Sequence, residues 1–263
     1  TVDGDLTITA SDNEARALVS VYEAEFNLKG GKLLANNAEF SRGIVTINKD
    51  SIFTMSGGTI CGNPEKQSIG VYIQDWTANG GTKTVTFNMN GGTIKDCHSS
   101  SYGGAVYVTN DKEIYVNLTA GSIENCSANR GGAIFMCKGN LMIGSDMSIS
   151  DCCASDKGGA VYLNSGANLT MAGGTISECY ASNQGGAIAV NQSTSFIMNG
   201  GLIEKCYTTY SHGGGVYVNL ASFTMNGGII SKCQTASTNN GGGIYVSDST
   251  FTMENGTISE CIS

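Results

Sequence analysis

Three ionisable residues occupy the same place in successive repeats of the chain. Asp151, Glu178 and Lys205 follow one another at intervals of 27 residues. A glycoside hydrolase needs a close pair of carboxylates, and a polysaccharide lyase needs carboxylates that bind Ca²⁺ beside a basic residue. A carbohydrate-active enzyme, either a lyase or a hydrolase, that uses these three residues is therefore the catalytic hypothesis.

Other features of the sequence argue against catalysis. The repeats are most regular between Asp151 and Lys205, whereas an active site usually interrupts a repeat. The arginines lie in other repeats, at Arg16, Arg42 and Arg130. Nucleophile-elbow, P-loop and RTX-type motifs are absent, and alternating charges are typical of a solvated surface. We therefore expect no enzyme, and neither a metal nor a cofactor.

Seven of the ten cysteines occupy one position of the repeat, three residues after a recurring isoleucine. They are Cys97, Cys126, Cys152, Cys179, Cys206, Cys233 and Cys261. If the repeats stack, these residues form an internal column in which each thiol acts as a small apolar group. Disulfides between neighbouring rungs are within Cα reach but strained, and zinc binding lacks a CxxC motif. We favour buried free thiols.

The chain repeats with a period close to 27 residues. Residues 185–206, GGAIAVNQSTSFIMNGGLIEKC, return as GGGVYVNLASFTMNGGIISKC at 213–233. One marker, the apolar residue that opens the FTM-like triplet, recurs throughout the chain. It stands at Phe26, Phe53, Phe87, Val116, Met142, Leu169, Phe196, Phe223 and Phe251. A fixed period of this kind is the signature of a solenoid.

Apolar residues alternate in three short runs of each repeat: GGAVYV, FTM and GTI. Val106 and Val108 represent the first run, and Phe223 and Met225 the second. Alternation favours strands, and double glycines provide the backbone angles of corners. We therefore predict an all-β chain that folds as a right-handed, single-stranded parallel β-helix. It would have about nine coils of about 27 residues, with three short strands per coil.

The N-terminal residues are the least regular. We expect residues 1–25 to form an irregular coil or cap, and residues 26–263 to form the repeat domain of a larger surface protein. Between residues 11 and 22, the spacing of Ala15, Leu18 and Val19 fits a capping helix. Leu18–Val21 also fits the repeat register, one period before Ile44–Ile47. We favour a strand there.

An aromatic residue recurs between the two inward positions of GGAVYV. This outward column is Tyr72, Tyr107, Phe135, Tyr162, Ala189, Tyr217 and Tyr245. Alanine or glycine beside the rings predicts an accessible flat face, so Tyr107, Phe135, Tyr162, Tyr217 and Tyr245 are candidate ligand contacts. The structural alternative is that the rings stack on one another for stability.

Two further regions are candidates for binding. An insertion near residues 74–86 carries Trp76, the single tryptophan, beside Asp75, and insertions in solenoids often carry function. An aromatic side chain there is a candidate contact for a sugar or a protein. The polar segments that follow the cysteine column offer a second patch, formed by Tyr180, Tyr207, Tyr210 and His212.

Composition limits the partners. The net charge is −8 and no Lys/Arg cluster occurs, so binding to nucleic acid is not expected. No apolar run is long enough to insert into a membrane, and we expect a monomer. Thr-rich outward columns can bind ice on a flat β-helix, but here Ile143, Ile197 and Leu202 interrupt them.

The repeats resemble the GGAI and FxxN motifs of chlamydial polymorphic outer-membrane proteins and related bacterial adhesin-like surface proteins. GGAV, GGAI or GGGV begin at Gly103, Gly131, Gly158, Gly185, Gly213 and Gly241, and FxxN begins at Phe87, Phe196 and Phe223. The resemblance covers nearly the whole chain. It implies a β-helix at a bacterial cell surface or secreted, which binds a host or matrix glycan or protein, or acts as a rigid spacer.

Overall fold

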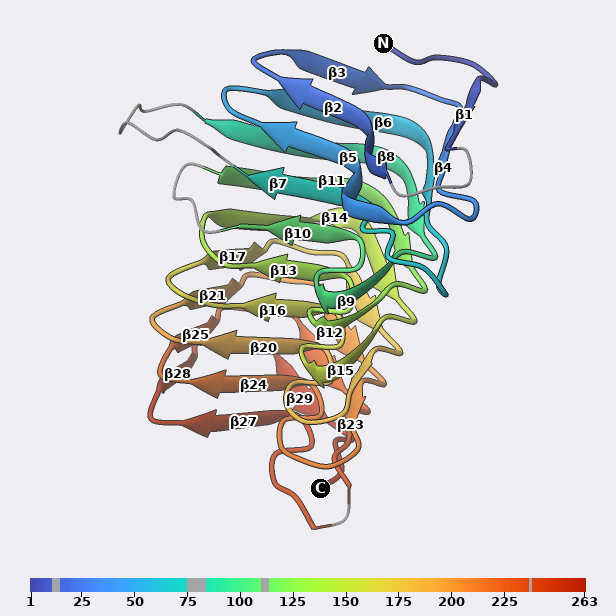
Figure 1. The fold of residues 1–263 in the computed structure, drawn as a ribbon. Helices are drawn as coiled ribbons and strands as arrows, with labels where there is room; N and C mark the ends of the chain where they lie inside the picture. Colours follow the sequence, from blue (N-terminus) through green and yellow to red (C-terminus); the bar gives the residue numbers. More distant parts are fainter. Residues whose placement is uncertain (11–14, 75–83, 110–113, 237) are drawn as a thin grey trace.

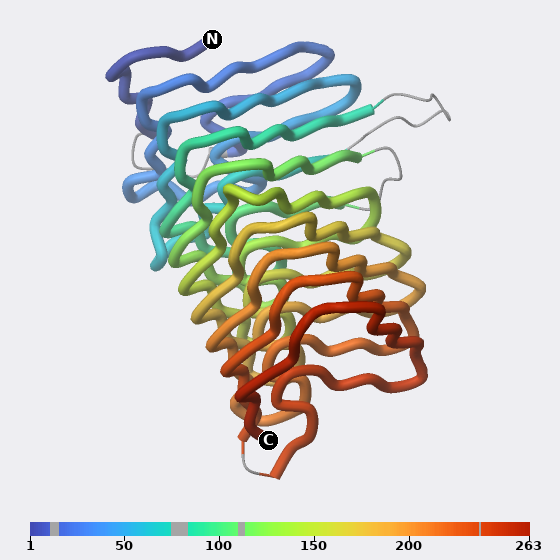
Figure 2. The backbone as a smooth tube through the Cα atoms, turned by 180° about the vertical axis from the view of Figure 1, so that it is seen from behind, coloured from blue at the N-terminus to red at the C-terminus, as the bar shows by residue number. Residues whose placement is uncertain are grey.

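The computed structural model describes residues 1–10, 15–74, 84–109, 114–236 and 238–263. These residues form β-strands and turns and no helix, and equivalent strands of successive coils pair in parallel. Seen from the N-terminal end, the chain turns clockwise as it moves away from the viewer (Figures 1 and 2). The structure thus confirms the predicted parallel β-helix, and the winding is right-handed.

Three parallel sheets enclose one core. The aromatic sheet contains β2 (Ala15–Tyr22), β5 (Phe40–Asn48), β7 (Val71–Gln74), β10 (Val106–Val108), β13 (Ile134–Met136), β16 (Val161–Leu163), β20 (Ile188–Asn191), β24 (Val216–Asn219) and β27 (Ile244–Ser247). The corner sheet contains β9 (His98–Tyr102), β12 (Ser127–Arg130), β15 (Cys153–Lys157), β19 (Tyr180–Ala181) and β23 (Tyr207–Thr208).

The remaining strands form the bent sheet. They are β1 (Thr7–Thr9), β3 (Glu25–Leu28), β4 (Lys32–Leu34), β6 (Ile52–Cys61), β8 (Val85–Lys95), β11 (Ile114–Glu124), β14 (Asn140–Ser150), β17 (Asn168–Met171), β18 (Thr175–Ser177), β21 (Ser195–Met198), β22 (Leu202–Glu204), β25 (Ser222–Met225), β26 (Ile229–Ser231), β28 (Thr250–Met253) and β29 (Thr257–Ser259).

The division of a coil into strands differs from the prediction. The FTM and GTI segments are two arms of the bent sheet, continuous in β8 and β11, rather than strands of separate sheets. The polar segments after the cysteine column, which were not among the predicted strands, form the corner sheet. These polar segments pair because rigid sheets on both sides bring their backbones into register with the next rung.

A glycine pair makes the bend. Gly201 has φ +92, which L side chains rarely adopt, and a Cβ added there would lie 2.7 Å from the carbonyl oxygen of Gly174. The asparagine that precedes this pair also has a structural role. Asn226 Nδ2 donates a hydrogen bond to Asn199 Oδ1 at 2.9 Å, which connects two rungs at the bend.

The N-terminal segment belongs to the solenoid. β2 pairs in parallel with β5, and β1 pairs with β4, so the first rung has the same arrangement as later ones. The strand alternative is therefore confirmed for residues 15–22. Residues 11–14 lie outside the described part of the chain.

The core consists of columns of identical or similar side chains. Phe53 and Phe87 stack with ring centroids 5.0 Å apart, and Phe196 and Phe223 stack at 4.4 Å. A second column contains the fully buried isoleucines Ile94, Ile123, Ile149, Ile176, Ile203 and Ile230. Because each rung buries its apolar residues against the next, stability is shared between neighbouring coils.

One predicted position is wrong by a residue. Leu141, rather than Met142, pairs with Val116 and Leu169 in the core, and Ile143 is fully buried instead of outward. The register between β11 and β14 shifts between Leu118 and Ala120, because β14 has one residue more than β11 at this point. Counting back from the later part of the repeat therefore selected Met142 instead of Leu141.

Candidate functional site

The aromatic column forms as predicted, but its rings are not freely accessible. Tyr107 pairs with Phe135, and Phe135 with Tyr162, along the aromatic sheet. Phe135 and Tyr162 are each only 5% exposed and Tyr217 is 7% exposed. The expectation of an open face is therefore wrong for these three candidate residues, while Tyr107 and Tyr245 are half-buried.

Residues from the corner side cover this column. The ring of Tyr102 lies 4.4 Å from that of Phe135, and Arg130 lies over the ring of Tyr162 at 5.8 Å. The ring of His212 stacks on Tyr245 at 4.4 Å. This burial raises the pKa of Tyr107 to about 12 and also raises the pKa of Tyr162. The column is therefore largely a second, smaller core.

The insertion candidates are not placed. Trp76 and Asp75 lie outside the described residues, so their proposed role in binding stays a prediction. The predicted corner patch is divided: Tyr180 and Tyr207 stack on one another, whereas His212 contacts Tyr245 and accepts a hydrogen bond from the Asn240 backbone.

An open groove of about 260 Å³ runs across the corner sheet. We call it the corner-sheet groove. Its lining comes from β9, β12, β15 and β19 and includes His98, Ser127, Asn129, Cys153, Ser155 and Tyr180. Four of these side chains occupy one repeat position, the residue after each column cysteine. The sequence could therefore have indicated this groove, because the residue after each column cysteine is polar or aromatic in successive repeats. These residues are His98, Ser127, Cys153, Tyr180 and Tyr207.

At one end of the groove, the exposed ring of Tyr180 stacks on the half-buried ring of Tyr207. The rings of Tyr180 and Tyr207 are 5.1 Å apart and nearly parallel, at 11°, and Tyr180 is 37% exposed. A hydrogen bond with the Cys153 side chain raises the pKa of Tyr180 to about 12. An exposed aromatic ring such as that of Tyr180 can stack against the apolar face of a sugar.

Polar side chains line the rest of the groove. His98 Nδ1 and Ser127 Oγ are 2.8 Å apart, and Asn129 Nδ2 donates to Ser155 Oγ at 2.9 Å. On the same two strands, Arg130 Nε donates to Asp156 Oδ2 at 2.8 Å, outside the groove lining. These hydrogen bonds hold hydroxyl, amide and imidazole groups in fixed positions on a rigid sheet, which suits recognition of a polar ligand.

The charged column of the catalytic hypothesis lies elsewhere. Asp151, Glu178 and Lys205 are exposed and have φ values of 55°, 56° and 54°, so they form the left-handed turn before each column cysteine. Lys205 Nζ and Glu178 Oε1 are 3.2 Å apart, with half of each side chain exposed. None of the three residues lines the corner-sheet groove. An exposed pair of this kind contributes little to stability.

The cysteine column is internal. All ten cysteines are free thiols, and Cys97, Cys126, Cys152, Cys179, Cys206 and Cys233 are fully buried. Each column thiol donates to the backbone carbonyl two residues earlier, as in Cys179 to Ser177 at 3.2 Å. Burial raises the pKa of Cys126 and Cys152 well above the ordinary value. Among the described residues, no group of three or more His, Cys, Asp or Glu side chains is arranged to hold a metal ion.

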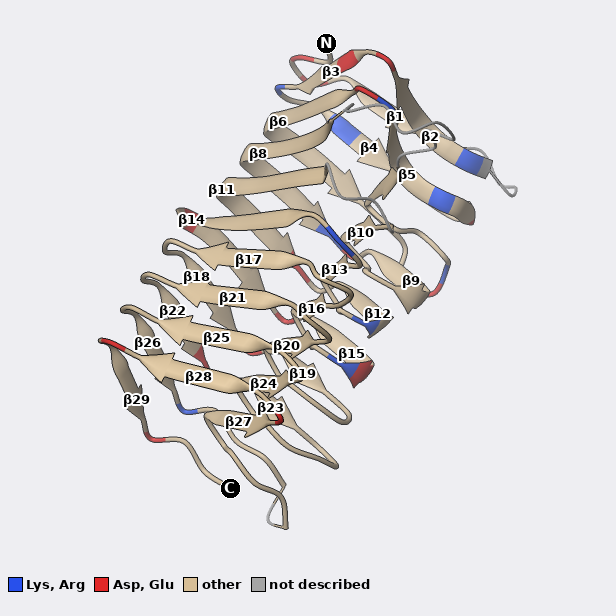
Figure 3. Cartoon of the chain, turned by 90° about the vertical axis from the view of Figure 1, so that its left-hand side faces the viewer, with Lys and Arg blue, Asp and Glu red and all other residues tan. Residues whose placement is uncertain are grey.

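Charges are dispersed over the surface. Figure 3 shows basic and acidic residues at bends and near the N-terminal end, with uncharged β17, β21, β25 and β28 side by side. None of the described segments is a helix that could cross a bilayer. No protein-family model, no curated protein and no solved structure matched the chain significantly.

Proposed function

We propose that this chain is a non-catalytic, adhesin-like β-helix, displayed at a bacterial cell surface or secreted, that binds a host or matrix glycan through the corner-sheet groove. The observation that carries the proposal is the exposed Tyr180 ring, stacked on the half-buried Tyr207, beside fixed polar groups. The GGAI and FxxN repeats support the surface location by resemblance.

The rigidity of the solenoid supports this role. Ligand recognition by a preformed groove avoids the entropic cost of ordering a flexible loop on binding. Successive rungs also place equivalent side chains about 4.8 Å apart, so one ligand can contact several rungs. The same rod can hold its binding face at a distance from the surface that anchors it.

A glycan array and an array of matrix proteins test this function. We expect glycan binding by the wild-type chain, and at least a tenfold loss of affinity in Tyr180→Ala/Tyr207→Ala. Tyr115→Ala is the matched control, because Tyr115 is equally exposed, at 37%, but lies on the bent sheet. Binding to a matrix protein, without binding to any glycan, would show that the ligand is a protein and not a glycan. Unchanged affinity of the double variant would contradict it.

The carbohydrate-active alternative has its own measurement. The wild-type chain is incubated with polysaccharides, and new reducing ends and 4,5-unsaturated products are measured. We expect neither, because the exposed Glu178–Lys205 pair lies on a turn and not in the corner-sheet groove. Turnover that is lost in Glu178→Gln would establish the enzyme and overturn the proposal.

A further inference from the structure

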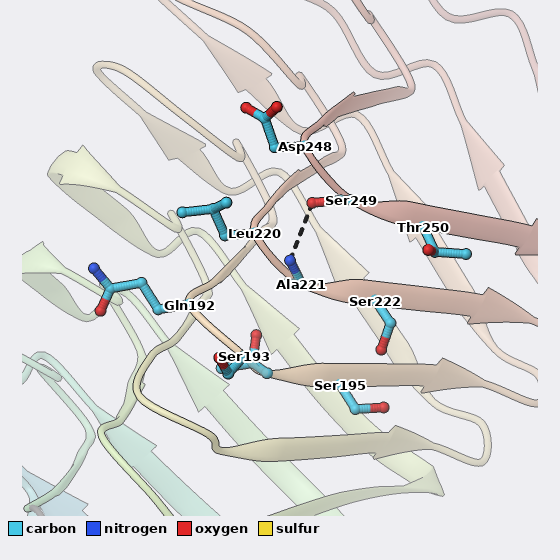
Figure 4. Close-up of a pocket in the computed structure, with 10 residues that line it drawn as sticks. Gln192, Ser193, Ser195, Leu220, Ala221, Ser222, Asp248, Ser249 and Thr250 are labelled. Carbon is cyan, nitrogen blue, oxygen red and sulfur yellow. Dashed lines mark hydrogen bonds between the residues drawn. The ribbon is translucent and has the colours of Figure 1, made fainter.

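A second groove, of about 780 Å³, lies where the aromatic sheet turns into the bent sheet in the last three coils. Figure 4 shows the residues that line it. We call it the axial groove, because three successive connections of the solenoid cross it. These connections are residues 192–194, 220–221 and 248–249. None of its lining residues belongs to the corner-sheet groove.

The floor of the axial groove carries a row of hydroxyl groups. Ser195, Ser222 and Thr250 open β21, β25 and β28 and pair with one another in register. Their spacing of about 4.8 Å along the solenoid axis follows from the parallel sheet. This spacing approximates the length of one sugar residue in an extended chain, so successive hydroxyls can contact successive sugars.

The outer side of the groove carries three different side chains at one repeat position. Gln192, Leu220 and Asp248 all have left-handed backbone angles, with φ of 48°, 52° and 47°. Leu220 is 55% exposed between an amide and a carboxylate. An exposed leucine in this backbone conformation costs stability without gaining burial, and such strain tends to persist at functional positions.

Two buried polar groups beside the groove have no hydrogen-bond partner. Thr194 lines the groove and is 2% exposed, and its Oγ1 is unpaired; Asn191 Nδ2, at the end of β20, is also unpaired. Buried polar atoms are nearly always hydrogen-bonded. Both atoms are inaccessible to solvent, so they pack beside the groove and are not themselves contacts for a ligand.

From these features we infer that the axial groove is a binding site for a neutral oligosaccharide that lies along the solenoid axis. Leu220 contacts the apolar face of a central sugar, and the serine and threonine hydroxyls bind sugar hydroxyls. The lining holds one carboxylate, Asp248, and neither lysine nor arginine, so a polyanionic glycan is disfavoured. This inference does not depend on ligand binding at the corner-sheet groove.

Titration calorimetry with cellohexaose, xylohexaose, maltohexaose and the anionic hexagalacturonate tests the inference. We expect at least one neutral hexasaccharide to bind and hexagalacturonate to bind at least tenfold more weakly. Leu220→Gly should reduce the affinity at least tenfold while keeping the fold, because glycine accepts the left-handed backbone without strain.

Lys232→Gly is the matched control, because Lys232 has φ of 54° at an exposed turn outside both grooves. It should leave the affinity unchanged, as should Tyr180→Ala/Tyr207→Ala. Absence of binding by all three neutral sugars, or equal affinity of Leu220→Gly and the wild type, would overturn the inference. Loss of binding only in the tyrosine variant would overturn it as well, while supporting the proposed function at the corner-sheet groove.

Discussion

The cysteines have two different environments, and these determine their reactivity. Six column thiols are fully buried, whereas Cys61, Cys137, Cys153 and Cys261 are only half-buried. A thiolate is the reactive species, and burial in an apolar core suppresses its formation. The column therefore acts as packing, which is the interpretation that the sequence favoured.

Reaction with a thiol-specific chromogenic disulfide tests this division. In the native protein we expect at most four of the ten thiols to react within minutes, and all ten to react in denaturant. Mass spectrometry of the modified peptides should locate the label at the four half-buried positions. Rapid native labelling of Cys152 or Cys179 would contradict the internal column.

Partial burial of Tyr107 makes the stability of the fold depend on pH in the alkaline range. Burial raises the pKa of Tyr107 to about 12, above the ordinary value of about 10. The neutral phenol is therefore favoured in the fold, and its contribution is fully present below about pH 10 and lost as the pH rises through 12. Urea unfolding at pH 9 and pH 11 should show a smaller loss of stability in Tyr107→Phe than in the wild type. Equal losses would show that this phenol titrates normally.

Glycine is required at the bend because the backbone of the neighbouring rung lies very close, and not only because of the backbone angle. Gly201 and Gly166 have similar φ values, +92 and +89, but only Gly201 has backbone within 3 Å of an added Cβ. The left-handed angle alone costs about 1–2 kcal/mol for another residue. We expect Gly166→Ala to lower the free energy of unfolding by that amount and Gly201→Ala by clearly more, as measured by urea denaturation. Equal effects of the two substitutions would show that the close contact at Gly201 does not contribute.

At the scale of strands, the repeat period and the alternation were enough to predict the fold and the inward columns. They could not show that FTM and GTI share one sheet, because alternation is the same on either side of a bend. They also missed the corner sheet, whose polar segments such as Ser127–Arg130 pair only because the adjacent sheets hold them in register.

The candidate site was predicted less well than the fold. Outward positions on the aromatic sheet were identified correctly, but their exposure was not, because Tyr102 and Arg130 cover them from another sheet. Such cover depends on side-chain directions at a corner, which a repeat pattern does not specify. The corner-sheet groove was visible only as the residue after each column cysteine, a position whose outward direction the sequence left open.

The whole molecule should tolerate loss of a complete coil. Deletion of residues 158–184 joins Lys157 to Gly185, which begins the equivalent segment of the next coil. We expect a folded rod that is shorter by about 4.8 Å, because β13 can pair with β20 in the same register. Circular dichroism and small-angle X-ray scattering measure this change.

A half-coil deletion is the control for that experiment. Removing residues 158–171 places non-equivalent segments beside one another, so apolar residues would face solvent. We expect this variant to aggregate or unfold. If both deletions behaved alike, in-register stacking would not be what stabilises the chain.

Methyl–methyl contacts between rungs test the parallel stacking of the coils directly. In isoleucine-methyl-labelled protein, nuclear Overhauser effects should connect Ile176 with Ile203 and Ile203 with Ile230, each pair 27 residues apart and stacked in parallel register. Ile→Val substitution at each of the three positions removes one methyl signal and so assigns it. A parallel, in-register β-helix requires both contacts, and we expect to observe them. Their absence, or contacts arranged symmetrically about turns as in antiparallel hairpins, would exclude this fold.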